Sequence, residues 1–573
     1  MNKKIKRTIS LLCTVIIVLG FCGCSNNEQP IKGNGTEGKI ADLHWEDYDN
    51  PLIESQKEKD VYKRSELLHK AEEKLMKSGA NIPICFNSKY ILAKPFLEGI
   101  YWDPNGYVNL TTTKRTDGEK SLSASILTEP GSLDTAGDST ANSSTVNKHI
   151  FSNLVKLDKD FSAVPEMAQS YSISEDETVY TFYLRDNLKW SDGSDFSAKD
   201  FEYAWKRAAD TKNALEYGSL FNIIKGYPDN LEVKSSDDGK TLTVTLNHPC
   251  PYFLQLCAFA PFAPLKQEFV ESAEGYKNEK GEVVNPKAWA REANIVSNGP
   301  YTITEWKHNE KIVLKKNPYY YDADNIYLET INCMLSTDSS ASYSAYKSDD
   351  IQLMNQNIPN DAIPLLKDSR EFTNISTYSL ESVVVNTSSD IFKGLTMEEA
   401  ETFRQAIGYA INRQFIVDVA LTGTETPATT YIKKDMKIGE NYTYGETYDY
   451  KYPLEEGFYP KDGDLDTARE MLKSLGLKFG NDGKLINPIS IEYSYNSNAK
   501  TEAIAVCIQA DLAQLGITMI PSNKEFNVFI GERNKGQYEF GRQGWNPDFI
   551  DPYAMLSIFQ TGDSNNCIIF NNK

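Results

Sequence analysis

The two ends of the chain constrain its fold more than any other feature of the sequence. Residues 62–79 (YKRSELLHKAEEKLMKSG) carry apolar side chains at helical spacing and end on a glycine, which predicts an amphipathic helix. Two apolar, aromatic-rich strand candidates follow at residues 81–86 and 90–102. At the other end, a new apolar run begins at Cys567 and the chain stops at Lys573. Because helices and strands bury one face against other elements, we expect the front elements to complete a domain whose remainder lies elsewhere in the sequence.

The first residues have the pattern of a secretory leader. The cationic stretch MNKKIKR precedes the apolar stretch TISLLCTVIIVLGF, which is too short to span a bilayer comfortably. The next residues, FCGCS, resemble the lipobox of bacterial lipoproteins, which implies cleavage after Gly23 and diacylation of Cys24. An ordinary signal peptide that contains cysteine is the open alternative. We therefore expect a signal peptide at residues 1–23, a flexible tether at 24–46 and a lipid-anchored protein on the extracytoplasmic face of the cell membrane.

Charge and composition exclude one class of partner. The formal net charge is −20, and no basic stripe appears after the leader. Nucleic acid is not an expected partner, because neutralising its phosphates needs clustered Lys and Arg. Aromatic residues are abundant, with 33 Tyr, 25 Phe and 7 Trp. Tyrosine suits a wet recognition cleft but also suits ordinary sheets, so both interpretations stay open.

The sequence predicts neither a metal site nor a cofactor. The cysteines after Cys24 are scattered in apolar surroundings, which is typical of buried small residues, and the histidines occur singly. The segment KDGDLD lacks the glycine and closing glutamate of a calcium loop, so we expect Asp466 to cap a helix instead. No nucleophile elbow, P-loop or dinucleotide fingerprint is present.

From Ser121 onward, a series of motifs resembles the extracellular oligopeptide-binding proteins of ABC transporters, which are family 5 solute-binding proteins of the peptide/nickel-binding type. The series begins with EPGSLD, VPEMAQSY, TFYLRDNLKWSDG and AKDFEYAWKR. It continues with NGPYTITEWKHNEKIVLKKNPYYYDADN, FRQAIGYAINR, DTAREMLKSLGL and GERNKGQYEFGRQGWNPDFIDPYAMLSIF. Such a string of motifs in the family's order is far more specific than any single pattern.

The resemblance implies an α/β fold of the two-lobed, periplasmic-binding-protein-like type. The expected fold belongs to class II of these binding proteins, in its large form with an extra subdomain. It has mixed sheets, and a two-stranded hinge joins the lobes. Lobe one would span residues 87–376, with an inserted subdomain at about 160–285. Lobe two would combine residues 47–86 with residues 377–573.

The resemblance also explains the two ends of the chain. In the family, the GW…D…DP motif is followed by a short strand ending near F-N-N, a helix, an IP strand and a terminal KP segment. Here the matching elements stand at the front, from Tyr48 to Leu110. The interpretation is a circular permutation, with the new break between Lys573 and Tyr48 and the spacer TTTKRTDGEK joining the old ends. A misassembled gene, or a remnant fused to a truncated copy, is the alternative.

The resemblance implies a set of ligand-binding residues near the end of the chain. Asp548, preceded by Gly544 and Trp545, matches the family aspartate that pairs with the α-ammonium group of the ligand. A role in an Asn-Pro-Asp turn is the alternative for Asp548. Asp551 is expected to be structural, because Asp-Pro at a helix start is an ordinary cap arrangement.

Three basic residues are further candidates. Arg542 and Arg533 match family arginines near the ligand, and the planar arginine fork suits a carboxylate. Either could instead hold a structural ion pair. Lys500 lies near the place where the family has a basic residue that faces the carboxylate of short peptides.

Two positions depart from the family pattern. The strand along which the peptide backbone lies is aromatic-rich in the family, and here it reads SLESVVVN, from Ser379 through Val383 to Asn386. Main-chain pairing would survive this change, but aromatic packing on the ligand would not. Ser143 stands where some members have an acidic residue near the ligand. Peptide length and side-chain preference therefore stay open.

The function implied by the resemblance is capture of oligopeptides and their delivery to an ABC permease, without catalysis and as a monomer. A binder of another solute (a metal complex, haem or a sugar), a sensor of peptide signals and an inactive scaffold are the alternatives. An extracellular hydrolase is a competing class, which a turnover assay would reveal.

Overall fold

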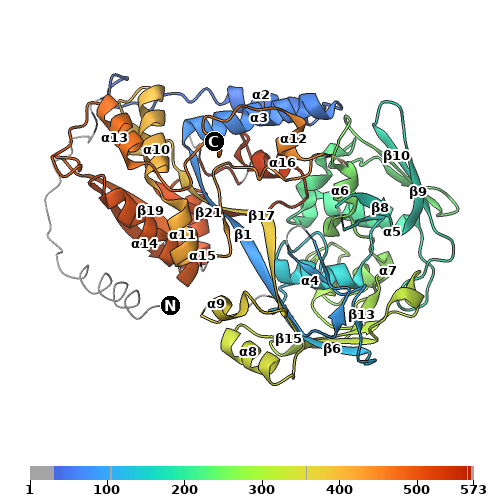
Figure 1. Ribbon diagram of the computed structural model, residues 1–573. Helices are drawn as coiled ribbons and strands as arrows, with labels where there is room; N and C mark the ends of the chain where they lie inside the picture. The colour runs from blue at the N-terminus through green and yellow to red at the C-terminus, as the bar shows by residue number, and fades with distance from the viewer. Residues whose placement is uncertain are drawn as a thin grey trace.

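The computed structural model describes residues 31, 33–103, 106–159, 161–355, 358–359, 361–421, 423–439, 442–563 and 565–568. The predicted signal peptide, Cys24 and Lys573 lie outside these residues. Two lobes stand side by side in Figure 1, joined by the long strands β1 (Asn81–Ala93) and β17 (Phe372–Val385). Among the described helices, none is long and apolar enough to cross a membrane.

One mixed sheet runs through both lobes. Its strands follow the order β13-β14-β15-β6-β16-β1-β17-β21-β19-β20, and β18 also pairs with β1. Pairing is parallel at β15–β6, β6–β16, β21–β19 and β19–β20 and antiparallel elsewhere along this path. The remaining bounds are β6 Ser121–Leu127, β13 Tyr301–Lys307, β14 Lys311–Lys316, β15 Thr330–Leu335, β16 Leu353–Asn355, β18 Thr426–Pro427, β19 Ile489–Asn496, β20 Ile517–Lys524 and β21 Phe540–Trp545.

Strands β1 and β17 form the connection between the lobes. They pair antiparallel from Asn81–Val384 to Leu92–Phe372, with irregularities in register on either side of Cys85 and Phe86. The end of β1 pairs with β16 in one lobe, and the end of β17 pairs with β21 in the other. This arrangement confirms the two-lobed α/β fold, with mixed sheets and a two-stranded hinge, that the sequence predicts.

The buried apolar residues divide between the lobes at these strands. One cluster extends from Ile91 to Leu353 and includes Ile375, Phe549 and Ala554. The other combines residues between 31 and 86 with residues between 378 and 568. The front of the chain and its C-terminal part therefore share one core. The cysteines at positions 85, 250, 257, 333, 507 and 567 are buried, and no disulfide bond links them in the described part of the chain.

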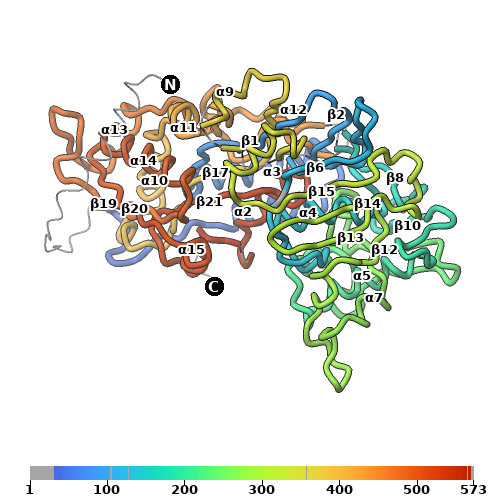
Figure 2. The backbone as a smooth tube through the Cα atoms, turned by 90° about the horizontal axis from the view of Figure 1, so that it is seen from below, coloured from blue at the N-terminus to red at the C-terminus, as the bar shows by residue number. Residues whose placement is uncertain are grey.

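A smaller sheet lies at the outer side of the first lobe. It has the order β11-β12-β10-β9 and is antiparallel. The alternation of buried and more exposed side chains along β10 explains why this sheet forms. Tyr180, Phe182 and Leu184 are buried, while the residues between them are more exposed. Helix α5 (Ala198–Ala209) packs on it behind a Ser197–Asp200 capping box, and this part projects downward in Figure 2. The strands are β9 Ala168–Ile173, β10 Val179–Leu184, β11 Val233–Ser235 and β12 Thr241–Thr245.

Two helices at the front of the chain pack on the second lobe. These are α2 (Glu46–Ser55) and α3 (Val61–Ser78). Asp60 caps α3 by accepting hydrogen bonds from the amides of Tyr62 and Lys63, and Gly79 ends it in the left-handed conformation with φ of 64°. The helix predicted at residues 62–79 is confirmed, and both helices lie along the same edge of the lobe (Figure 1).

The front helices contact the C-terminal part of the chain through named side chains. The Trp45 indole donates to the carbonyl of Phe559 at 2.9 Å, and the Tyr48 hydroxyl donates to that of Leu556 at 2.5 Å. The Arg64 guanidinium donates two hydrogen bonds, of 2.7 and 2.8 Å, to the carboxylate of Asp551. Asp551 also accepts from the amide of Tyr553 as the N-cap of α16 (Pro552–Leu556), which confirms its structural role.

A group of second-lobe helices lies on the left in Figure 1: α10 Met397–Ala410, α11 Arg413–Ala420, α13 Leu465–Ser474, α14 Ala499–Ala513 and α15 Phe526–Arg533. The N-cap of α13 is Asp464, which accepts a 2.9 Å hydrogen bond from the amide of Thr467. The prediction of Asp466 as the cap is therefore wrong by two residues. Asp466 lies in the first turn and pairs with Arg469 at 2.6 Å.

The buried carboxylate of Glu72 on α3 makes the stability of this packing depend on pH. It accepts hydrogen bonds of 2.9 Å from the amides of Tyr431 and Ile432 and from the hydroxyl of Tyr444. Burial raises its pKa to about 7. Since this pKa lies above its unfolded value, the stability that Glu72 contributes is present at pH 4 and is lost as the pH rises to 7.

We expect Glu72→Gln to unfold at a higher temperature than wild type at pH 8 and to show no such gain at pH 5, because an amide keeps the acceptor and removes the charge. Thermal unfolding at both pH values measures this, with Glu66→Gln on the exposed face of α3 as the control. A variant that is less stable than wild type by the same amount at both pH values would contradict the assignment.

Candidate functional site

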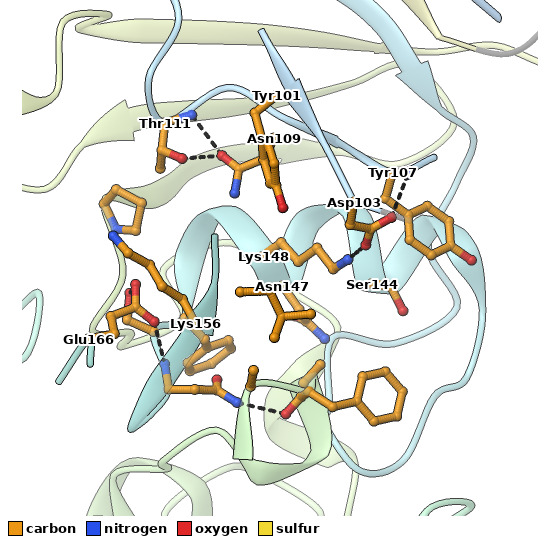
Figure 3. Close-up of a pocket in the computed structure, with 18 of the residues that line it drawn as sticks. Tyr101, Asp103, Tyr107, Asn109, Thr111, Ser144, Asn147, Lys148, Lys156 and Glu166 are labelled. Carbon is orange, nitrogen blue, oxygen red and sulfur yellow. Dashed lines mark hydrogen bonds and ion pairs between the residues drawn. The ribbon is translucent and has the colours of Figure 1, made fainter. Parts of the chain in front are cut away.

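A cavity of about 230 Å³ lies in the first lobe next to the segment that follows β21. Its walls come from α4 (Ala141–Ile150), from the hairpin of β3 (Tyr101–Trp102) and β4 (Val108–Asn109), and from residues 548–550. Figure 3 shows Tyr101 and Asn109 on one side and Asn147 and Lys148 on the other. The cavity therefore joins elements from the front, the middle and the end of the chain.

The acidic side chain of Asp548 lies on this wall and has no cation beside it. The Tyr217 hydroxyl donates to its Oδ1 atom at 3.3 Å, and no ion-pair partner lies within reach among the described residues. Burial raises the pKa of Asp548 to about 6, although the hydrogen bond from Tyr217 opposes this shift. A half-buried carboxylate without a counterion is suited to bind a cationic group of a ligand.

The strand that leads to Asp548 has a free edge. Strand β21 pairs with β17 from Phe540 to Trp545, whereas β19 pairs with it only at Phe540 and Gly541 in the described part of the chain. An extended peptide could therefore add along the outer edge of Gly544 and Trp545 and end at Asp548. The Trp545 indole donates to the carbonyl of Ala554 at 3.0 Å, which holds this segment in place.

The basic candidates Arg542 and Lys500 are already paired with carboxylates. Arg542 donates hydrogen bonds of 2.5 and 2.6 Å to Glu381, whose side chain is buried. Lys500 lies 3.0 Å from Glu425 and donates to the amide oxygen of Asn87 at 2.9 Å. Each charge is thus neutralised within the protein, so a ligand carboxylate would have to compete with a buried glutamate.

Arg533 and Asn386 contact the backbone near β21, and the Nε atom of Arg533 has no hydrogen-bond partner among the described residues. The Arg533 guanidinium lies 5.7 Å from the centre of the Phe529 ring and 3.5 Å from the carbonyl oxygen of Arg542. The Asn386 amide donates to the carbonyls of Gly536 and Tyr538 at 2.9 and 3.0 Å. Asn386 therefore holds the segment that precedes β21, whereas Arg533 contacts the backbone of β21 itself.

Val383 lies in the middle of the sheet. It pairs with Ile82 of β1 on one side and with Arg542 of β21 on the other, and its side chain is buried. Both edges of β17 are occupied there, so a ligand backbone cannot pair along residues 380–385. This corrects the expectation from the sequence and moves the available edge to β21.

Tyr217 is a site residue that the sequence analysis missed. It lies in EYGSLFN, just before the short helix at Gly218–Ile223, and no local pattern distinguishes it from the other tyrosines of the chain. Only the approach of residues 217 and 548 in space reveals the pair. Ser143 is fully buried on α4, and its neighbour Ser144 lines the cavity. The described residues contain no cluster of three or more His, Cys, Asp or Glu that could hold a metal ion.

Comparison with known proteins gives a consistent result. Residues 162–567 match the family described as "Bacterial extracellular solute-binding proteins, family 5 Middle". The oligopeptide-binding protein OppA of Bacillus subtilis (strain 168) is 30% identical over 466 residues, which cover 79% of this chain and 80% of that protein. The dipeptide-binding protein DppE of the same organism is 29% identical over 474 residues, covering 80% of each chain.

Solved structures show the same fold. An oligopeptide-binding protein of Borrelia burgdorferi (OppAIV) superposes with a TM-score of 0.61 and 25% identity, covering 79% of this chain and 85% of that one. OppA of Listeria monocytogenes bound to peptide gives a TM-score of 0.58 with 26% identity, covering 79% and 86%.

Proposed function

Since the chain belongs to the bacterial extracellular solute-binding proteins of family 5, which are binding proteins and not enzymes, we propose that it captures oligopeptides between its lobes and delivers them to an ABC permease. The unpaired carboxylate of Asp548 carries this proposal, because it would bind the α-ammonium group of the peptide. Tyr217 would orient this carboxylate, and the free edge of β21 would bind the peptide backbone.

We propose that the protein is held at the outer face of the membrane by lipid on Cys24. Two acyl chains provide a stable anchor, because each buried methylene contributes about 0.8 kcal/mol. The tether at residues 24–46 would then lead into the second lobe. Delivery to a permease requires release when the two lobes separate at β1 and β17.

We propose further that the chain is a circular permutant of the family, with lobe one at residues 87–376 and lobe two made of 47–86 and 377–573. The buried contacts of Trp45, Tyr48 and Arg64 with residues 551–559 support this. A chain reordered to run from 121 to 573 and then from 48 to 110 should bind the same peptides, and loss of binding in a folded reordered chain would count against the proposal.

The experiment that tests the function is ligand extraction. The chain from Ser25 onward is purified under native conditions, denatured, and the released small molecules are identified by mass spectrometry. We expect a mixture of short peptides with free amino termini. Absence of peptides, together with no rise in melting temperature on adding a peptide mixture, would overturn the proposal, because a bound ligand stabilises the folded state.

A further inference from the structure

The cavity beside Asp548 is lined by carboxamide side chains. Asn109, Asn147, Asn153 and Gln255 all contribute to its walls. Asn147 is 2% exposed, and its Oδ1 atom has no hydrogen-bond partner among the described residues. The same holds for Oε1 of Gln255, although the Nε2 atom of Gln255 donates to the carbonyl of Phe161 at 3.0 Å. Buried polar atoms are almost always paired, so these two atoms indicate a partner that binds from the cavity.

The cations of the cavity are paired or exposed, whereas a buried carboxylate of its wall has only neutral hydrogen-bond donors. Lys148 forms an ion pair with Asp103, as Figure 3 shows. The carboxylate of Glu166 accepts hydrogen bonds from the Ser152 hydroxyl and the Asn153 amide, both at 3.1 Å. Lys156 is exposed to solvent. Glu166 has no ion-pair partner among the described residues, so the buried part of the cavity offers the carboxylates of Asp548 and Glu166 and the carboxamide oxygens, all of which accept hydrogen bonds.

We infer that this cavity receives the side chain of the first residue of the ligand and selects a side chain that donates hydrogen bonds, such as a carboxamide or an ammonium group. The inference rests on the proposed function, since Asp548 on the same wall would hold the α-ammonium of that residue. A volume of about 230 Å³ suits one side chain, because sites for whole ligands measure roughly 300–1,000 Å³.

The chemistry of the walls explains the selection. An apolar side chain in the cavity would leave the Asn147 and Gln255 oxygens without a partner and without water. An anionic side chain would lose its hydration beside the carboxylates of Glu166 and Asp548, and the buried wall offers it no unpaired cation among the described residues. A site that hydrogen-bonds a polar group rejects analogues that lack the group, so a preference of about tenfold or more is expected.

The test uses tripeptides and isothermal titration calorimetry. Asn-Ala-Ala and Leu-Ala-Ala have first side chains of nearly equal size, while Asp-Ala-Ala and Lys-Ala-Ala add a charge. Ala-Asn-Ala and Ala-Leu-Ala move the same change to the second residue. We expect wild type to bind Asn-Ala-Ala and Lys-Ala-Ala about tenfold or more tightly than Leu-Ala-Ala and Asp-Ala-Ala, and to show a smaller difference for the second-residue pair.

Two variants assign the preference to the cavity. Asn147→Leu and Gln255→Met should each bring the affinities for Asn-Ala-Ala and Leu-Ala-Ala to near equality. Gln509→Met is the matched control, because Gln509 on α14 also donates one hydrogen bond to a carbonyl, that of Met519, at 2.8 Å, and lies outside the cavity. It should leave the preference unchanged.

The outcomes separate the inference from the function on which it rests. If all first-residue peptides bind wild type equally well, or if the preference persists in both cavity variants, the inference is overturned and peptide binding stands. If none of the peptides binds to wild type, the proposed function fails as well. Circular dichroism identifies a cavity variant that does not fold. The comparison then uses the other cavity variant alone.

Discussion

Replacing Asp548 with asparagine should weaken peptide binding about 30-fold or more. Removing one charge of a desolvated, hydrogen-bonded pair costs about 2–5 kcal/mol, and each 1.4 kcal/mol is a factor of ten in affinity. The variant should keep its fold, because the carboxylate has one hydrogen bond and no ion pair among the described residues. Titration calorimetry with a peptide identified by ligand extraction measures the effect.

The same variant should be more stable than wild type when no ligand is bound. The pKa of Asp548 is raised to about 6 by burial, above its unfolded value. The stability that this group contributes is therefore present at low pH and is lost as the pH rises through 6. At pH 7, Asp548→Asn should unfold at a higher temperature than wild type, whereas Asp466→Asn, an exposed control, should change neither binding nor stability.

Peptide affinity should depend on pH through the same carboxylate. Below a pKa of about 6, the group takes up a proton and no longer attracts an ammonium ion. With a pKa near 6, affinity at pH 5 should be about tenfold lower than the plateau above pH 7. Asp548→Asn should abolish this dependence. An unchanged pH profile in the variant would mean that another group titrates.

Replacing Arg64 with methionine should destabilise the protein by about 3–5 kcal/mol. Arg64 and Asp551 form a buried, doubly hydrogen-bonded ion pair with side chains 2% exposed, and removal of one partner leaves an uncompensated buried charge. The double variant Arg64→Met/Asp551→Asn should recover part of this loss, because asparagine keeps the cap acceptor for Tyr553 and removes the charge. Urea unfolding measures the free energies of unfolding of wild type, of Arg64→Met and of the double variant.

Lys70→Met on the same helix is the matched control. Lys70 pairs with Glu66 at 2.8 Å on the exposed face, and pairs of this kind contribute about 0.3–0.5 kcal/mol. If Arg64→Met lowers the free energy of unfolding by no more than Lys70→Met does, the front of the chain is not docked on α16. The account of the second lobe then fails. The comparison therefore tests whether both ends of the chain belong to one core.

Much of the fold could be predicted from the sequence because the relevant signals are local or run in a known order. The spacing of apolar residues at 62–79 and the glycine at 79 predict α3 within one residue at each end. The order of motifs from Ser121 onward implied two lobes and a two-stranded hinge, which the structure confirms. The cap of α13 was misplaced, because Asp464 and Asp466 are both suitable residues and only the backbone decides between them.

The candidate site was harder to predict, because its chemistry depends on partners that are distant in sequence. Glu381 neutralises Arg542 across 161 positions, and Glu425 neutralises Lys500 across 75. Neither pairing has a local signature, so two residues that suit a ligand carboxylate in sequence are engaged in the structure. Tyr217 reaches Asp548 across 331 positions for the same reason.

The most direct test of the central claim compares one peptide with its Nα-acetylated form. Acetylation removes the α-ammonium charge and leaves the rest of the peptide unchanged. Calorimetry with wild type should show binding of the acetylated peptide about 30-fold or more weaker, and Asp548→Asn should bind both forms equally weakly. Equal affinity of both peptides for wild type would contradict the assignment of Asp548 as the receptor for the amino terminus of the ligand.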